Sequence, residues 1–337
     1  MAEDILSKEI NPESNLNEDE LFIRVENNLL DSEKIDAPAY SYWRSVFRCF
    51  FKNPVNIVAL IMLFIIIILA YVQPLFSGYE RMNGVSLGNP MLLSPFSTYT
   101  VEQVIDGEVV IKNVFFLFGT DANRDNFFDF IWKGTQFSLT LAFIVTAIDM
   151  VLGILAGALW GYSKLCDKIF TEIYNIVANV PSLVVTIIIL YALGNSFWNI
   201  VLALTCTAWL GIGYSFRTQV IIIRDRDYNL ASRCLGTSTF RMITHNILPF
   251  LVSIIVTYIS NYLPSCIGSE VFLSYIGLGF NQYTASLGSA INEGVGYISR
   301  AENYIFWIPV IVSAIVTITL YVAGQGLADA SDPRNHR

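Results

Sequence analysis

Six long apolar runs alternate with polar segments along the 337 residues of the chain. The runs cover approximately residues 55–76, 135–160, 169–193, 198–222, 250–268 and 304–325. A helix needs about 20 apolar residues to cross the roughly 30 Å hydrocarbon core of a bilayer, and each run is close to that length. The pattern therefore predicts an all-α, polytopic membrane protein with six transmembrane helices.

Basic residues are distributed unequally between the two sides that six spans define. With the N-terminus inside the cell, fifteen of the 20 Lys and Arg residues lie on the cytoplasmic side. The outward-facing ones are Arg81, Lys112, Arg124, Lys133 and Arg300. Because basic residues near the ends of spans resist translocation, this bias predicts that the N- and C-termini are cytoplasmic.

The part of the chain before the first span has two different compositions. Residues 1–38 are strongly acidic, and we expect them to form a disordered cytoplasmic tail. Residues 39–54 place aromatic and basic side chains on different faces of a helix, which predicts an elbow helix on the membrane surface. The alternative is a simple cytoplasmic extension of the first transmembrane helix, which covers residues 55–76.

The remaining segments form a core with connections on both sides. Residues 77–133 predict an extracellular segment, and stretches such as Tyr99–Val101 and Val109–Val114 within it are strand-like. Residues 134–326 predict a five-helix core that contains a long cytoplasmic loop at 223–249. The last residues, 327–337, predict a short cytoplasmic tail.

Composition narrows the classes of function. Hydrophobic residues make up 54% of the chain and charged residues 14%, whereas an average soluble domain has about 25% charged residues. The net charge of −8 comes entirely from residues 1–38, so the chain has no basic face that predicts nucleic-acid binding. The five Cys form no CxxC pair and there are only two His, which argues against a zinc, redox or His-based catalytic site.

The cytoplasmic loop at 223–249 has the pattern of two short helices joined by a turn. An amphipathic segment ends at Gly236, which can adopt the left-handed conformation that terminates helices. Thr237 or Ser238 can cap a second helix that runs to Pro249. Such a compact projection is small enough to enter a groove on a partner protein.

This loop resembles the coupling loop in the membrane subunits of ATP-binding cassette importers. The family pattern is Glu-Ala-Ala, three residues, Gly, nine residues, and then Ile-x-Leu-Pro. The matching positions here are Leu230, Ala231, Ser232, Gly236, Leu248 and Pro249, and every spacing agrees. Three identities differ, because Leu230 replaces Glu, Ser232 replaces the second Ala, and Asn246 replaces Ile.

Further stretches resemble the oligopeptide and dipeptide permeases of the C type, in particular those of Gram-positive bacteria. They include Leu117–Asp125, Gly134–Leu139, Glu270–Gly279 and Leu327–Arg334. The resemblance extends over residues 40–334. It implies the type I importer permease fold, a location in the cell membrane, and transport of oligopeptides into the cell.

The resemblance also implies partners, because the chain has no phosphate-binding motif of its own. No Lys follows a Gly anywhere in the sequence, so a GxxxxGK[ST] loop is absent. The implied complex contains a homologous second permease, two cytoplasmic ATPases and an extracellular lipid-anchored peptide-binding protein. The chain itself would be no enzyme and bind no cofactor, since ATP and Mg would belong to the ATPases.

Polar residues within the spans are candidates for the translocation path, because burying them in a membrane is costly. We expect Glu270 either to line the path and meet a peptide amine, or to be held in a structural hydrogen bond. Asp149 either faces the path or pairs inside the helix bundle. Tyr258, Asn261 and Tyr262 add hydrogen-bonding groups if the polar stripe of the fifth span faces inward.

Other functions remain as alternatives. Related permeases take up nickel chelates or opine-like solutes, although the scarcity of His disfavours direct metal ligation. A membrane receptor that senses peptides without moving them is a second alternative. An intramembrane hydrolase needs a paired nucleophile and base, and the spans offer Asp149 without a second Asp or a His.

Overall fold

A computed structural model describes residues 41–80, 88–105, 108–280 and 284–332. The predicted acidic tail at 1–38 and the end of the predicted C-terminal tail, from 333 onward, lie outside these ranges. The described part is mainly helical, as the apolar pattern predicts.

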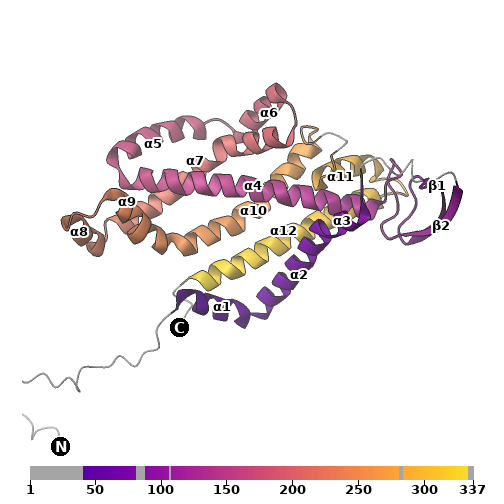
Figure 1. The fold of residues 1–337 in the computed structure, drawn as a ribbon. Coiled ribbons are helices and arrows are strands. Elements are labelled where there is room, and N and C mark those ends of the chain that lie inside the picture. The colour runs from indigo at the N-terminus through magenta and orange to yellow at the C-terminus, as the bar shows by residue number, and fades with distance from the viewer. Residues whose placement is uncertain (1–40, 81–87, 106–107, 281–283, 333–337) are drawn as a thin grey trace, which may run out of the picture. The chain divides into compact units, whose positions relative to one another are not determined.

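Within the described ranges, five helical segments are long and apolar enough to cross a membrane. They are α2 with α3 (Pro54–Tyr71 and Gln73–Ser77), α4 (Phe127–Tyr162), α7 (Phe197–Arg224), the segment from α9 to the end of α10 (Thr239–Arg241 and Val252–Tyr275), and α12 (Tyr304–Ser331). Figure 1 shows α4, α7, α10, α12 and α2 running side by side. The sixth predicted span corresponds to the pair α5 (Lys164–Ala178) and α6 (Ser182–Leu193).

Helices α5 and α6 are separate, whereas the apolar run at 169–193 predicts one transmembrane helix. The two helices are bent by 80° relative to each other at the break. Pro181 lies between them, in an extended conformation with φ −56° and ψ 119°. Proline cannot donate a helical hydrogen bond, and its ring disfavours helical geometry in the residue before it, so the chain turns at this point.

The shorter helices lie between and beside the long ones. They are α1 (Tyr42–Lys52), α8 (Asp227–Cys234), the π-helix η1 (Met242–Ile247), the 3₁₀-helix η2 (Leu248–Leu251), α11 (Leu287–Gly294) and the 3₁₀-helix η3 (Val295–Tyr297). Helix α1 packs against α12 through Val46 and Phe50, and its Tyr42 hydroxyl donates to the carbonyl of Ser331 at 2.8 Å. Its Trp43 and Phe47 are exposed, as a helix on a membrane surface requires.

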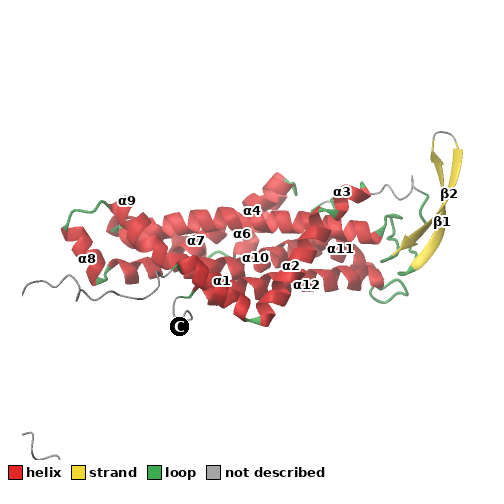
Figure 2. Ribbon diagram, turned by 60° about the horizontal axis from the view of Figure 1, so that its bottom comes forward, coloured by secondary structure: helices red, strands yellow, loops and turns green. Residues whose placement is uncertain are grey.

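A two-stranded antiparallel hairpin interrupts the helical pattern. Strand β1 (Ser97–Ile105) pairs with β2 (Glu108–Phe116), with Ser97 opposite Phe116. This confirms the strand-like stretches within the predicted extracellular segment. Figures 1 and 2 both place the hairpin at the end of the helical bundle opposite α8 and α9.

Helices α4 and α7 approach each other closely because small residues line their contact. Gly153, Gly157 and Gly161 recur at every fourth position of α4 and so share one face. A Cβ added at Gly157 would lie 2.5 Å from the carbonyl oxygen of Gly213 in α7. Small residues at such positions let two helix backbones pack without intervening side chains, a common arrangement in membranes.

This packing predicts that Gly157→Ala destabilises the protein. The added methyl group forces α4 and α7 apart, and overpacking of this kind typically costs about 1–3 kcal/mol. The thermal unfolding temperature of the purified protein in detergent should therefore fall.

Gly211→Ala is the matched control, because nothing lies within 4 Å of a Cβ at this position of α7. Alanine is about 1 kcal/mol more favourable than glycine inside a helix, so this variant should unfold no earlier than the parent. Equal losses in the two variants would contradict the tight α4–α7 contact.

Candidate functional site

The turn between the two halves of the coupling loop, residues 223–249, has the geometry that the sequence predicts. Gly236 adopts φ +80°, which is in the left-handed region. Its N–H donates to the carbonyl of Arg233 at 2.9 Å, and the N–H of Thr237 donates to the carbonyl of Ser232 at 3.2 Å. These two bonds form a Schellman motif, which satisfies the last carbonyl groups of α8.

The second half of the loop differs from the predicted α-helix. Only α9 (Thr239–Arg241) is α-helical, and η1 and η2 continue it as a π-helix and a 3₁₀-helix. Ser238 occupies the predicted cap position, although its side chain makes no capping hydrogen bond. Pro249 lacks the N–H that a continuous α-helix would use, so the backbone follows other hydrogen-bonding patterns here. Single π-helical turns are frequent at functional sites.

The second half of the loop is anchored in the protein interior. Met242, Ile247 and Leu251 are fully buried against Phe216 and Val220 of α7. Because burying each apolar side chain contributes on the order of 2 kcal/mol, this half is fixed firmly to the helix bundle. The loop therefore packs as one unit with α7, and η2 continues it directly into α10.

A buried asparagine that the sequence did not single out joins the two halves. The side-chain amide of Asn229 donates to the carbonyl of Ile223 at 2.8 Å, at the end of α7. The Asn246 amide donates to Asn229 Oδ1 at 3.3 Å and to Ser232 Oγ at 3.2 Å. Ser232 and Asn246 are two of the three departures from the family pattern, and they contact each other. Only their contact in space indicates that the two departures belong together.

Basic residues tie the loop to the end of α4. Arg224 donates through Nη1 to the carbonyl of Gly161 at 2.8 Å and through Nε to Asp225 Oδ1 at 2.8 Å. The guanidinium of Arg233 lies over the ring of Tyr162, at 5.3 Å from its centroid. The hydrogen bonds from Arg224 stabilise the charged carboxylate and lower the pKa of Asp225 below its usual value.

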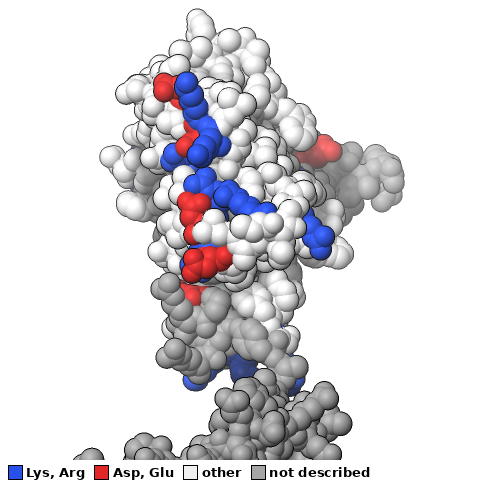
Figure 3. All heavy atoms as spheres, turned by 90° about the vertical axis from the view of Figure 1, so that its left-hand side faces the viewer, with Lys and Arg blue, Asp and Glu red and all other residues white. Residues whose placement is uncertain are grey.

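The tip of the loop exposes large apolar side chains. Leu235 is 87% exposed, Phe240 is 78% exposed and Leu230 is 41% exposed. Figure 3 looks at the end of the molecule that carries α8 and α9, where Lys, Arg, Asp and Glu side chains gather. Exposed apolar groups with a charged surround are typical of a surface that contacts another protein.

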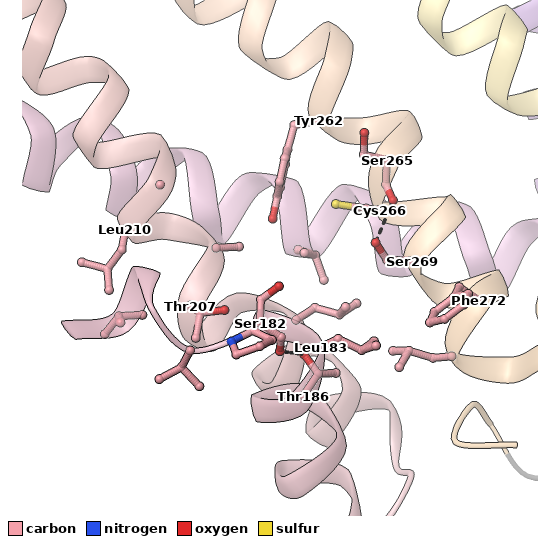
Figure 4. A pocket seen from close by; sticks show the side chains of 18 of the residues that line it. Ser182, Leu183, Thr186, Thr207, Leu210, Tyr262, Ser265, Cys266, Ser269 and Phe272 are labelled. Carbon is pink, nitrogen blue, oxygen red and sulfur yellow. Dashed lines mark hydrogen bonds between the residues drawn. The ribbon is translucent and has the colours of Figure 1, made fainter. Parts of the chain in front are cut away.

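A central cavity of about 690 Å³ lies where the break between α5 and α6 faces α7 and α10, and it is open to the surface, since lining residues such as Ser182 and Ser269 are exposed. Figure 4 shows Tyr262, Cys266 and Ser269 of α10 on one side, opposite Thr207 of α7 and Ser182 of α6. Its described lining combines hydroxyl groups with apolar side chains and includes no Lys, Arg, Asp or Glu. A cavity of this size and composition is suited to a small polar ligand.

The structure separates the five predicted path residues. Tyr262 lines the cavity, and its hydroxyl donates to Asp149 Oδ2 at 2.5 Å. Tyr258 packs against the ring of Phe216 at 5.2 Å between centroids. Asn261 is exposed on another face of α10 and accepts a hydrogen bond from Gln325 of α12 at 2.9 Å.

Glu270 is buried away from the cavity. Its Oε2 accepts a hydrogen bond from Ser138 of α4 at 2.9 Å. Its Oε1 accepts bonds from Ser286, which caps α11, at 2.8 Å, and from Ser274 of α10 at 3.1 Å. The carboxyl group therefore ties together α4, α10 and α11, which corresponds to the structural alternative for this residue.

The described ranges contain no cluster of three His, Cys, Asp or Glu side chains that could hold a metal ion. The polar groups of the site are instead hydroxyls, amides and a few ion pairs.

Two family sequence profiles match this chain. "Binding-protein-dependent transport system inner membrane component" matches residues 149–337, which include the coupling loop and the cavity-lining parts of α5, α6, α7 and α10. "N-terminal TM domain of oligopeptide transport permease C" matches residues 41–95, which include α1 and α2.

Several characterised proteins are similar over nearly their whole length. The oligopeptide transport system permease protein AmiD of Streptococcus pneumoniae is 41% identical over 94% of this chain and 98% of its own. The dipeptide transport system permease protein DppC of Lactococcus lactis is 32% identical over 95% of this chain and 98% of its own.

A solved structure shares the fold. It is an inward-facing conformation of the MetNI methionine ABC transporter, with a TM-score of 0.50 and 19% sequence identity. The match covers 60% of this chain and 96% of the other. The family profile, the relatives that match over nearly their whole length, and the long apolar helices together show that the chain is located in a membrane. The chain is a multi-pass membrane protein that belongs to the family of inner membrane components of binding-protein-dependent transport systems.

Proposed function

We propose that this chain is the permease subunit of an ATP-binding cassette importer that moves oligopeptides into the cell. The observation that carries the proposal is the 41% identity to an oligopeptide permease over almost the full length of both chains. The family implies that an ATPase and a substrate-binding protein act with it. The coupling loop supports the same role, because it presents a rigid projection with exposed apolar side chains.

The proposed assembly pairs this chain with one homologous permease and two cytoplasmic ATPase subunits. The end that carries α8 and α9 faces the cytoplasm in this arrangement, and the hairpin end faces a lipid-anchored peptide-binding protein outside. ATP and Mg²⁺ belong to the ATPase subunits, because this sequence has no phosphate-binding loop.

The coupling loop acts as a lever in this proposal. Leu235 and Phe240 enter a groove on the ATPase, and closure of the two ATPases around nucleotide displaces them. The loop moves as one body because Gly236 ends α8 in a fixed turn and Asn229 binds the two halves together. The displacement reaches α7 and α10, which line the central cavity, and so changes the access to it.

Gly236→Val should abolish uptake of a labelled peptide while the protein remains in the membrane. A β-branched residue at φ +80° is strained, although nothing lies within 4 Å of the new Cβ, so the turn and not the packing changes. The measurement is uptake per permease molecule in vesicles that contain the complete complex.

Gly277→Val provides the matched control. Gly277 has φ +81°, open space around a Cβ, and the same pair of backbone hydrogen bonds at the end of α10. It lies outside the coupling loop, so it should retain a much larger share of uptake per molecule. Normal uptake by Gly236→Val would rule out the lever.

The hydrogen bond between Ser232 and Asn246 predicts that substitutions at these two positions have non-additive effects on stability. Ser232→Ala and Asn246→Ile each remove the same hydrogen bond, so the double variant should lose less stability than the sum of the two single variants. The expected difference is about 1 kcal/mol, the usual net contribution of one hydrogen bond. Thermal unfolding of the four proteins in detergent measures it.

Thr244→Ala combined with Ser232→Ala is the control pair. The Thr244 hydroxyl donates to the carbonyl of Phe240 at 2.9 Å, and Ser232 donates to the carbonyl of Tyr228 at 3.0 Å, so the two share no bond. Their effects should add. Additive effects of Ser232→Ala and Asn246→Ile as well would mean that the two departures are independent.

A further inference from the structure

One wall of the central cavity contains a buried carboxylate behind a tyrosine. Asp149 of α4 has no exposed surface, and its Oδ2 accepts the 2.5 Å hydrogen bond from Tyr262. Its other oxygen, Oδ1, is buried and has no hydrogen-bond partner among the described residues. Tyr262 itself lines the cavity beside Cys266 (Figure 4).

A carboxylate with one satisfied oxygen is unusual at such a position. Acidic groups in membrane spans are costly unless they are paired, and buried polar atoms nearly always have a partner. Glu270 is a contrasting case in the same protein, because three serine hydroxyls donate hydrogen bonds to its two carboxylate oxygens. Asp149 has a single such donor, so packing alone does not account for its charge.

Asp149 itself is not among the described residues that line the cavity, and Tyr262, which does line it, connects the carboxylate to a ligand there. No Lys or Arg is among the described residues that line it, so the field of Asp149 is not compensated by a protein cation there. The Tyr262 oxygen donates its hydrogen to Asp149 and keeps lone pairs that can accept a hydrogen bond from a ligand. Chains of hydrogen bonds of this kind polarise one another, which strengthens the acceptor.

Aromatic groups in the lining favour the same ligand chemistry. Tyr174 and Phe272 contribute rings to the cavity wall, and one face of the Tyr174 ring is covered by Tyr214, at 4.4 Å between centroids. The faces of aromatic rings attract cations, with about 0.5–2 kcal/mol per contact. An ammonium group therefore gains from both the Asp149–Tyr262 pair and the rings, whereas an anion is repelled.

We propose that the Asp149–Tyr262 pair makes the central cavity a binding subsite for a primary ammonium group, which is the free N-terminus of the transported peptide. The identity of the ligand rests on the proposed function as a peptide importer. A Lys side chain carries the same chemistry, and the experiment separates it from the N-terminus.

The electrostatic part is tested without any transport. Ser269, which lines the cavity, is replaced by Cys in a chain whose five natural Cys have been removed, and the complex is assembled in membrane vesicles. A cationic and an anionic methanethiosulfonate reagent of similar size then react with the new thiol. The cationic reagent should react faster by a factor on the order of ten, because a charged cavity concentrates ions of opposite sign.

Variants of Asp149 assign this preference to its carboxylate. Asp149→Asn keeps the size of the side chain and an acceptor for Tyr262, and it should bring the two rates close to equal. Asp149→Glu keeps the charge and should keep the preference. Asp129→Asn is the matched control, since it removes an acid from the same helix about 30 Å away along its axis and should leave the preference unchanged.

Uptake measurements test the identity of the ligand. We expect Asp149→Asn to lower the uptake of peptides with a free N-terminus several-fold relative to N-acetylated peptides of the same sequence. A loss confined to peptides that contain Lys would overturn the assignment to the N-terminus.

Two results distinguish this inference from the proposed function. Equal reaction rates of the two reagents in the chain with Asp149 intact would overturn the subsite, and this needs no Asp149 variant to fold. A cationic preference that depends on Asp149, in a complex that imports no peptide, would support the subsite and contradict the proposed peptide substrate.

Discussion

The close contact between α4 and α7 is the interaction on which the coupling loop and the cavity both depend. Glycines at every fourth position let the two backbones meet, with Gly157 against Gly213. At one end of this contact, the carbonyl of Gly161 accepts a hydrogen bond from Arg224, which fixes the start of the loop. Further along α4, Asp149 accepts a hydrogen bond from Tyr262, which lines the cavity. A wider separation of α4 and α7 would disturb both features together.

The coupling loop shows how a structural role can persist when the residues of a motif change. The turn at Gly236 depends on backbone geometry, and its two hydrogen bonds involve no side chain. The departures at Ser232 and Asn246 form a hydrogen-bonded contact that also includes Asn229. A buried polar contact is stabilising only when its groups are satisfied, and here each of the three side chains has a partner.

The cavity exists because the third predicted span is broken. The turn at Pro181 directs α6 away from α5, and the residues around the break form one wall of the cavity. Asp149 and Glu270, two buried acids of the bundle, have different surroundings. Glu270 is enclosed by hydroxyl donors from three segments, whereas Asp149 has one donor, the cavity-lining Tyr262. Two acidic side chains thus differ in how completely the protein itself satisfies them.

The sequence by itself determined the features that depend on local spacing. Apolar runs indicated the long helices, strand-like stretches at Tyr99–Val101 and Val109–Val114 indicated the two strands, and a glycine at the end of a short helix indicated the left-handed turn at Gly236. Tertiary structure decided the angle at Pro181, the role of Asn229, and the different surroundings of Asp149 and Glu270. Tyr262, which donates to Asp149, and Ser138, one of the three donors to Glu270, each lie more than 100 residues away from the acid in the chain. No periodicity along a sequence reports which distant side chains will meet, because helix packing alone brings them together.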